Sequence, residues 1–219
     1  MTEALRPRSG DALIVVDVQY DFLPGGALAV AGGDEILPAV HRLVDAFETV
    51  VFTQDWHPAG HASFASSHPG KAPFETTVLP YGEQRLWPDH CVQASRGAAL
   101  HEDLAVHRAQ ILLRKGMNPH IDSYSAFVEA DGRTTTGLAA FLKARGVGRV
   151  FLCGLATDFC VGFSALDARE AGFETVLVED ACRGIDAEGS LAAALARMEA
   201  AGVVRATSAA VLGTTLTSA

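Results

Sequence analysis

The chain has 219 residues, of which 49% are hydrophobic, and its 17 basic and 26 acidic side chains give a net charge of −9. This length and apolar content predict a single domain, residues 1–219, with a full core of the α/β kind. The negative charge argues against binding to nucleic acid or to anionic membranes, and no apolar run reaches the roughly 18 residues of a membrane span.

Cysteine usage and the N-terminal residues indicate the compartment. Residues 1–8 contain no apolar segment of the signal-peptide kind. Four cysteines in a chain of this length do not make a disulfide framework. We therefore expect a cytoplasmic protein, and a free reactive thiol is compatible with that reducing environment.

Apolar and β-branched runs recur along the chain and predict buried parallel strands. They occupy residues 12–16, 49–53, 109–114, 149–153 and 175–178, and a last strand begins at 203. Helix-forming segments alternate with them, at residues 35–47, 138–145, 161–171 and 187–201. This alternation predicts a mainly parallel sheet with helices on both faces, joined by right-handed crossovers.

Residues 54–96 show little periodicity. Prolines interrupt this stretch at Pro58, Pro69, Pro73, Pro80 and Pro88. A loop of this length inside a compact domain is usually functional, so we expect a site loop at about 54–96.

Chemically reactive side chains follow four of the predicted strands. Asp17, Asp55 and Lys115 end three of them, and Cys160 follows a fourth after a turn through Gly154. A single aspartate after a strand is most often a turn or cap residue. Ligands of parallel sheets bind beyond the carboxyl ends of the strands, so four such groups at one edge predict a site there.

Cys160 is expected in the first turn of a helix that Asp158 caps, as Asp34 is expected to cap the helix at 35–47. The helix dipole and free N–H groups at such a position stabilise an anion. The sequence therefore predicts a lowered pKa for the Cys160 thiol and a thiolate nucleophile. The alternative is a small buried residue at a strand–helix turn.

The nucleophile hypothesis needs a base and a cation. Asp17 suits the base, because it can take the thiol proton and return it to a leaving amine. Lys115 suits the cation that stabilises the thiolate, and its alternative is an ordinary salt bridge. The last histidine of the chain is His120, so no histidine follows Cys160 to serve as its base. Backbone N–H groups at Ala156 and Cys160 would form an oxyanion hole.

The loop after Asp55 has the composition of a metal site. Asp55 and His57, with His61 and His90 further on, offer ligand types that suit zinc, iron or manganese. The i, i+2 spacing of Asp55 and His57 puts both side chains on one side of an extended backbone. A lone loop histidine is usually a solvated residue, and the clustering favours a metal. Aromatic residues nearby suit either a pocket wall or ordinary core: Phe22, Trp56, Trp87 and Tyr124.

At these residues the chain resembles the nicotinamidase/pyrazinamidase family of isochorismatase-like hydrolases, over residues 12–185. Each matching motif is short, but their order and spacing are specific. The motifs are DVQYDF (17–22), GGALAV (25–30), QDWHP (54–58), WPDHCVQ (87–93), KG (115–116), DSYSAF (122–127) and GLATDFCV (154–161).

The resemblance implies hydrolysis of nicotinamide, and of pyrazinamide, to the acid and ammonia through a cysteine thioester, in NAD salvage. It implies the sheet order 3-2-1-4-5-6 and a cis peptide at Leu155-Ala156. The residues that it assigns are the catalytic Asp17, Lys115 and Cys160, the oxyanion-hole amides of Ala156 and Cys160, the ring-sandwiching Phe22 and Trp87, and the metal ligands Asp55, His57 and His90.

The resemblance further implies one divalent metal ion that holds the pyridine nitrogen, with zinc in first place and iron or manganese as alternatives. His61 matches a position that ligates metal in only some members, so it is left out of the ligand set. Family members often carry Asn where this chain has Tyr20, and this position lies beside the site. We expect a homo-oligomer that binds a small-molecule substrate.

Three other functions compete with this one. Another amidohydrolase of the superfamily would act on a carbamoyl or ureido group and generally lacks the metal. Ether hydrolysis of the isochorismatase type uses no cysteine nucleophile, so Cys160 counts against it. A metal- or redox-sensing protein would release no ammonia from any amide and would oxidise Cys160 reversibly.

Overall fold

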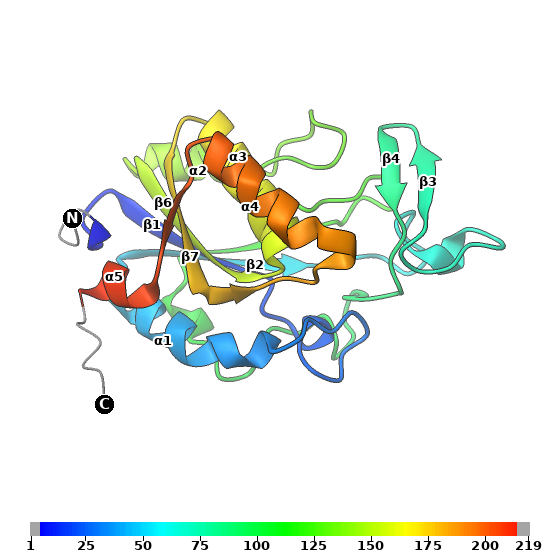
Figure 1. The fold of residues 1–219 in the computed structure, drawn as a ribbon, viewed down its shortest axis with the longest axis horizontal. Helices are drawn as coiled ribbons and strands as arrows, with labels where there is room; N and C mark the ends of the chain where they lie inside the picture. Colours follow the sequence, from blue (N-terminus) through cyan, green and yellow to red (C-terminus); the bar gives the residue numbers. More distant parts are fainter. Residues whose placement is uncertain (1–4, 214–219) are drawn as a thin grey trace.

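The computed structural model describes residues 5–213, so the first half of the N-terminal segment considered above lies outside the described residues. Within them, a six-stranded parallel sheet forms the centre of the molecule (Figure 1). Its strands are β1 (Asp11–Val16), β2 (Thr49–Asp55), β5 (Ile111–Lys115), β6 (Arg149–Leu155), β7 (Glu174–Arg183) and β8 (Val204–Ala206). The order β5-β2-β1-β6-β7-β8 confirms the predicted order 3-2-1-4-5-6.

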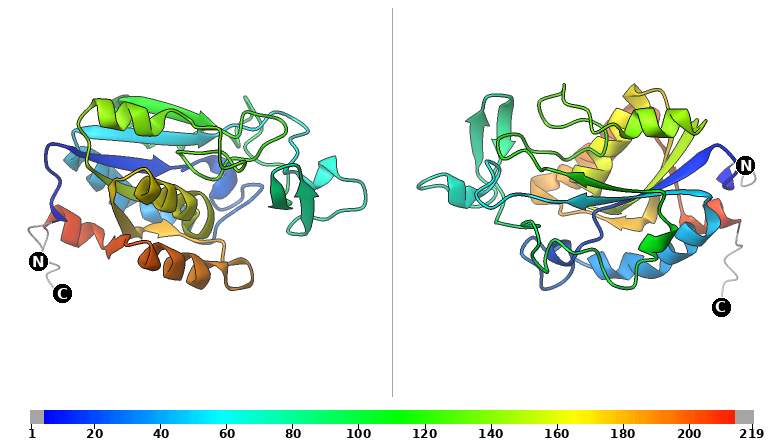
Figure 2. Two further views of the ribbon diagram at one scale, coloured as in Figure 1. Left: turned by 90° about the horizontal axis from the view of Figure 1, so that it is seen from above. Right: turned by 180° about the vertical axis from the view of Figure 1, so that it is seen from behind.

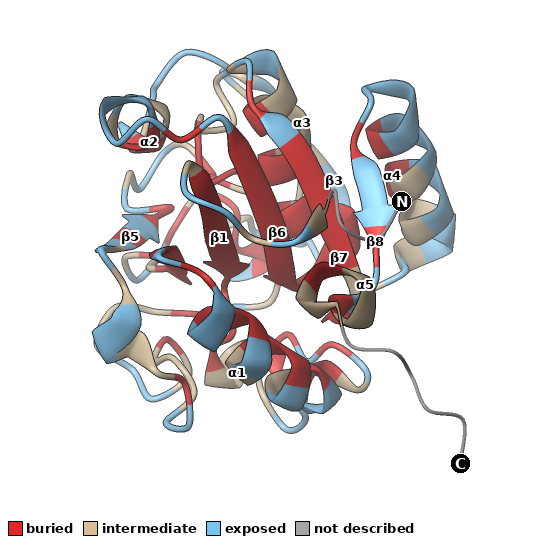
Figure 3. Cartoon of the chain, turned by 90° about the vertical axis from the view of Figure 1, so that its left-hand side faces the viewer, coloured by how far each residue is buried: buried red, intermediate tan, exposed pale blue. Residues whose placement is uncertain are grey.

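Three of the central strands are buried along their whole length, because helices cover both faces of the sheet. Every residue of β1, β2 and β6 is buried, as continuous apolar runs in a parallel sheet require. The edge strands β5 and β8 expose part of their residues. Figure 3 shows this contrast between buried central strands and exposed helix faces.

Five α-helices flank the sheet in the described part of the chain. They are α1 (Leu37–Ala46), α2 (Leu138–Ala144), α3 (Gly162–Glu170), α4 (Ser190–Ala200) and α5 (Ser208–Leu212). Figure 1 shows α1 and α5 on one face and the other three on the opposite face, which confirms the prediction of helices on both faces. Pro38 is tolerated in α1 because it lies in the first turn.

Both predicted helix caps are wrong. Asp34 lies inside a short 3₁₀ turn, Gly33–Ile36, and the N-cap position of α1 is Ile36. Asp158 lies inside a π-helical turn, Thr157–Val161, that precedes α3 and whose N-cap position is Ala156. A short polar side chain near a helix start can accept hydrogen bonds from groups outside that helix. Asp158 does so in the site described below.

The loop at 54–96 contains a hairpin that the sequence pattern did not reveal. Its strands are β3 (Thr76–Leu79) and β4 (Gly82–Arg85), paired antiparallel. Figure 2 shows the hairpin standing out from the body of the molecule. Most of its residues are exposed or half-buried, so no apolar alternation marks it, and of the residues in these two strands only Gln84 is buried.

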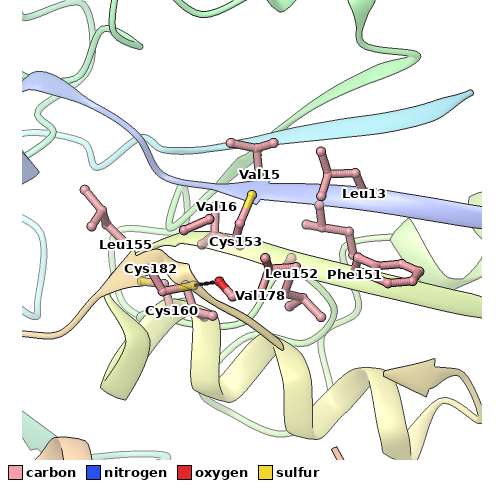
Figure 4. Close-up of a cluster of buried hydrophobic side chains, with 14 of the residues drawn as sticks. Leu13, Val15, Val16, Phe151, Leu152, Cys153, Leu155, Cys160, Val178 and Cys182 are labelled. Carbon is pink, nitrogen blue, oxygen red and sulfur yellow. Dashed lines mark hydrogen bonds between the residues drawn. The ribbon is translucent and has the colours of Figure 1, made fainter. Parts of the chain in front are cut away.

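The core beside the site consists of apolar side chains from β1 and β6. Figure 4 shows Leu13, Val15, Phe151 and Leu152 in this cluster, with Cys153 among them. Burial raises the pKa of the Cys153 thiol well above its usual value, which agrees with its expected role as inert core. No helix between residues 5 and 213 is long and apolar enough to cross a bilayer.

Candidate active site

The turn that carries Cys160 begins with a deformation of β6. The register of β6 against β7 shifts between Leu152 and Gly154, and Gly154 has φ = +117°. A Cβ atom at Gly154 would lie 2.1 Å from the carbonyl oxygen of Val16, so only glycine fits beside β1 here. The peptide bond that follows, Leu155-Ala156, is cis, as the resemblance implies.

Lys115 lies at the centre of the charged group. Its side chain is fully buried, and Nζ lies 2.8 Å from Asp17 Oδ2. The ammonium donates to Asp55 Oδ1 at 3.0 Å, to the carbonyl oxygen of Ser123 at 2.9 Å and to Cys160 Sγ at 3.3 Å. One lysine thus contacts the side chains that follow β1, β2 and β6.

The two oxygens of Asp17 have different surroundings. Oδ1 accepts a hydrogen bond of 2.6 Å from the Thr53 hydroxyl, whose oxygen in turn accepts from the Asp17 N–H at 3.1 Å. Oδ2 forms the ion pair with Lys115, but it accepts no directed hydrogen bond from residues 5–213. A carboxylate oxygen has two lone pairs, so Oδ2 can face the Lys115 ammonium and still keep one lone pair for an incoming proton.

Burial and neighbouring charges shift the pKa values of Lys115 and Asp17. Burial alone would lower the pKa of Lys115, but Asp17 and Asp55 raise it well above its usual value, so the lysine is charged. Burial raises the pKa of Asp17, although the charge of Lys115 opposes this.

The predicted lowering of the Cys160 pKa is wrong. Burial and the nearby carboxylates raise the pKa of this thiol well above its usual value, and Lys115 only partly offsets them. The prediction considered the helix end and omitted the desolvation of a sulfur that is 6% exposed. The resting group is therefore a thiol, and it has to give up its proton during the reaction.

Asp55, His57 and His90 bring their ligand atoms together. His57 Nε2 lies 3.0 Å and His90 Nε2 lies 3.4 Å from Asp55 Oδ2. His57 Nδ1 lies 3.0 Å from the carbonyl oxygen of Gly116, and His90 Nδ1 lies 2.8 Å from that of Pro88.

These backbone partners fix the tautomers of the two rings. A carbonyl oxygen only accepts, so in each ring Nδ1 carries the hydrogen, and in the neutral ring Nε2 carries a lone pair. Two such lone pairs and a carboxylate oxygen then face one point, as in a site for a divalent cation oriented by its outer hydrogen bonds. The donor set fits zinc, iron or manganese.

His61 packs against the ring of His57 but directs its nitrogens elsewhere. The ring centroids are 4.3 Å apart. His61 Nε2 faces the carbonyl oxygen of Asn118 at 2.8 Å, and Nδ1 accepts from the Ser63 N–H at 3.2 Å. With Asp122 nearby it belongs to a second buried group of possible ligands, but both of its nitrogens already have partners.

A small cavity lies beside these groups, and Cys160 forms part of its wall. It is lined by Phe22, Leu28, Asp55, Trp87, His90, Asp122, Tyr124, Ala156, Phe159, Cys160 and Ile185. The lining includes both residues expected to sandwich the ring and both expected oxyanion-hole residues. The predicted site residues that are not part of this wall are Asp17, His57 and Lys115.

Sequence reasoning missed several residues of this site. Phe159, Asp122 and Ile185 line the cavity, and Thr53 holds the base. Thr53 could have been found from its position, because it lies two residues before Asp55 on the same face of β2. Ile185 reaches the cavity from the loop after β7, and only the tertiary structure brings that loop here.

Gln19 positions the backbone of Asp55. Its Nε2 donates to the carbonyl oxygen of Asp55 at 2.8 Å, and its Oε1 accepts from the N–H of the same residue at 2.7 Å. Tyr20, the next residue, lies outside the cavity wall in the described part of the chain. It packs against His101 instead, with ring centroids 5.3 Å apart.

Asp158 fastens the loop that carries Ile185. Its Oδ1 accepts from the Ile185 N–H at 2.9 Å and its Oδ2 from the Asp186 N–H at 2.8 Å. The Ser190 hydroxyl also donates to Oδ2. The Asp158 carboxylate thus joins the turn that carries Cys160 to the loop that contributes Ile185 to the cavity wall.

Comparison with known proteins assigns the chain to a family. The isochorismatase domain model matches residues 11–210. The chain belongs to the isochorismatase family. A nicotinamidase of Acinetobacter baylyi is 55% identical over 197 residues, which cover 90% of this chain and 92% of that relative.

Two solved structures extend this comparison. PnC1 of L. infantum, solved in complex with nicotinate, is 43% identical with a TM-score of 0.82 over 94% of this chain and 97% of its own. A pyrazinamidase of Pyrococcus horikoshii in complex with zinc is 38% identical with a TM-score of 0.73, over 90% of this chain and 99% of its own. Both share the fold described above.

Proposed function

We propose that this isochorismatase-family protein is a nicotinamidase that converts nicotinamide, and pyrazinamide, to the acid and ammonia, in NAD salvage. The observation that carries the proposal is Lys115 Nζ, 2.8 Å from Asp17 Oδ2 and 3.3 Å from Cys160 Sγ, behind an aromatic cavity. The 55% identity with a nicotinamidase over 90% of the chain supports the same substrate.

The first half of the reaction forms a thioester. Asp17 Oδ2 takes the proton of the Cys160 thiol, and the charge of Lys115 stabilises the sulfur anion as it develops. The sulfur attacks the carboxamide carbon, and the carbonyl oxygen becomes negative against the N–H groups of Ala156 and Cys160. Asp17 then returns the proton to the amide nitrogen, the C–N bond breaks and ammonia leaves.

The second half hydrolyses the thioester. Asp17, again a carboxylate, takes a proton from a water molecule that attacks the acyl carbon. The bond to sulfur breaks, and the Cys160 thiol is restored with the proton that Asp17 held. The product leaves as nicotinic acid, which becomes nicotinate when it releases the second proton of the water molecule to solvent. The raised pKa of Asp17 suits this exchange, because it narrows the gap between the base and the buried thiol.

Substrate binding uses the cavity wall and the metal site. Phe22 and Trp87 hold the pyridine ring between them. A divalent cation held by Asp55, His57 and His90 supplies, when bound, a Lewis acid for the pyridine nitrogen. We propose zinc, since the P. horikoshii pyrazinamidase was solved with zinc and the donors are one carboxylate and two imidazoles.

The proposed location is the cytoplasm. All four cysteines are free and buried, and the mechanism needs the thiol of Cys160 reduced. The proposed partner is the small-molecule amide, with no nucleic acid or membrane, in line with the net charge of −9.

The test is an ammonia-release assay with nicotinamide and pyrazinamide, with and without a chelator. We expect release from both amides and a strong rise of KM, or loss of activity, when the metal is removed. Bound metal without nicotinamide turnover would indicate another heteroaromatic amide. No release from any amide, with reversible oxidation of Cys160, would instead indicate a redox sensor.

A further inference from the structure

The hairpin β3–β4 makes an unusual contact with the cavity wall. Gln84, on β4, is 2% exposed although its neighbours on the hairpin are exposed or half-buried. Its side chain enters the body of the protein beside Asp122 and Tyr124, which both line the cavity. Gln84 itself is not part of that wall.

The Gln84 amide has a defined orientation. Its Nε2 lies 2.8 Å from Asp122 Oδ2, 2.9 Å from the Tyr124 hydroxyl oxygen and 2.6 Å from the carbonyl oxygen of Arg85. Its Oε1 accepts from the Tyr81 hydroxyl at 3.0 Å. The opposite orientation would place Oε1 against the Asp122 carboxylate, so Asp122 fixes which end of the amide faces Tyr124.

Tyr124 passes this contact on to Trp87. The Trp87 indole Nε1–H donates to the Tyr124 hydroxyl oxygen at 2.9 Å. The indole also meets Phe159 edge-on, with ring centroids 4.8 Å apart and planes at 89°. These two contacts fix the orientation of the Trp87 indole plane. That plane forms one wall of the cavity that would bind a flat substrate.

We infer that Gln84 is a positioning residue that sets the plane of Trp87 through Tyr124, so the hairpin is a support of the substrate cavity. The effect that we expect on the KM for nicotinamide rests on the proposed nicotinamidase function. Gln84 touches neither the substrate nor the reacting atoms, so its effect belongs to binding rather than to the chemical steps.

The first test is Gln84→Met, which keeps the side-chain volume and removes both N–H donors. We expect the KM for nicotinamide to rise about tenfold, the effect of one lost hydrogen bond to a charged or oriented group, with kcat within about threefold. Glu83→Gln, on the exposed neighbour in the same strand, is the matched control and keeps the wild-type KM. A folded Gln84→Met protein with wild-type KM would overturn the inference.

A double variant tests whether Gln84 acts on Trp87 through Tyr124, a path that we call the relay, or through a general loss of structure. Tyr124→Phe removes the hydroxyl oxygen that accepts from the Gln84 amide. In that background Gln84→Met should change KM by no more than about twofold, because the contact between the two side chains is already lost. The same tenfold rise in both backgrounds would show that Gln84 acts by another route and would refute the relay.

A readout that needs no turnover is the indole N–H resonance of Trp87, assigned with Trp87→Phe. It should shift in Gln84→Met and stay in place in Glu83→Gln; an unmoved resonance would overturn the inference. Wild-type protein that releases no ammonia from nicotinamide would defeat the proposed function alone, and the resonance would still decide the relay. If Gln84→Met does not fold, the substitute variant is Tyr81→Phe, which removes the hydrogen bond to Gln84 Oε1. It should shift the same Trp87 resonance, and an unmoved resonance would refute the relay.

Discussion

Cys160 illustrates how burial and charge compete at one residue. Desolvation raises the pKa of this thiol, and the ammonium of Lys115 opposes the rise without overcoming it. A resting thiol next to a proton-accepting carboxylate resists oxidation until substrate arrives, because the thiolate is the reactive form. The reaction therefore depends on proton transfer to Asp17 more than on a preformed anion.

Cys160→Ala should reduce ammonia release from nicotinamide by at least about a thousandfold, because the thioester cannot form. The unfolding transition measured by circular dichroism should remain cooperative. Cys153→Ala is the matched control: this cysteine is buried in β6 among aliphatic side chains and should keep wild-type kcat. Undiminished turnover in Cys160→Ala would refute the assignment of the nucleophile.

Asp17 should govern the acidic limb of the pH profile of kcat/KM. Its carboxylate is the active form, and its pKa is raised above 3.8, so activity falls as pH drops through that raised value. The Thr53 hydroxyl donates to Oδ1 and stabilises the ionised form. Thr53→Val should therefore move the limb to still higher pH, and a limb that moves down or stays would contradict the assignment of Asp17 as base.

At the scale of elements, the turn after β6 depends on the close approach of two strands. Gly154 lies against the backbone of Val16 with a positive φ, so an added methyl group has no space and no relaxed conformation. The turn that carries Cys160 begins three residues later.

Gly154→Ala should lower the free energy of unfolding by about 3 kcal/mol or more, since strain and overpacking add. Urea denaturation measures this. Gly60→Ala is the control, because Gly60 also has a positive φ, +73°, but no atom lies within 4 Å of its added Cβ. We expect about 1 kcal/mol there, and equal losses at the two sites would contradict the steric argument.

The hairpin β3–β4 and the loop after β7 lie far apart in sequence, yet both contact the surroundings of the same cavity. One contributes Gln84 behind the wall, and the other contributes Ile185 to it. Neither segment has a strong periodic pattern, which is usual for segments that are shaped by a few polar contacts rather than by apolar burial.

At the scale of the whole molecule, metal binding should couple to stability. The three candidate ligands come from β2 and from the loop that follows it, so a bound cation joins the sheet to that loop. A ligand that binds only the folded state stabilises it by mass action.

Zinc at about a hundredfold its Kd should stabilise the metal-free protein by about 2.7 kcal/mol, or about 5–10 °C in Tm. Differential scanning fluorimetry measures the shift. His90→Ala should lose most of it, whereas His107→Ala, at an exposed histidine, should retain it. An equal shift in wild type and His90→Ala would place the ion elsewhere.

The homo-oligomer and the single domain of residues 1–219 stay predictions. Both edge strands expose apolar side chains, with Leu112 on β5 at 41% and Val204 on β8 at 48%. Sedimentation equilibrium measures the number of copies directly.

The sheet and the edge at which the site lies could be predicted from the residues alone. Apolar runs marked five of the six strands and the start of the last, and Asp17, Asp55, Lys115 and Cys160 follow four of them. Their proximity could be expected because parallel strands direct their carboxyl ends to one edge. The resemblance supplied the sheet order and the metal ligands, which spacing alone left open.

Three features could not be predicted in this way: the protonation of Cys160, the partners of Asp158 and the position of Gln84. Each depends on groups distant in sequence: the burial of the sulfur, the N–H groups of the loop after β7, and the hydroxyl of Tyr124. A local pattern records which faces are apolar, but desolvation and polar contacts depend on what the completed fold places against them.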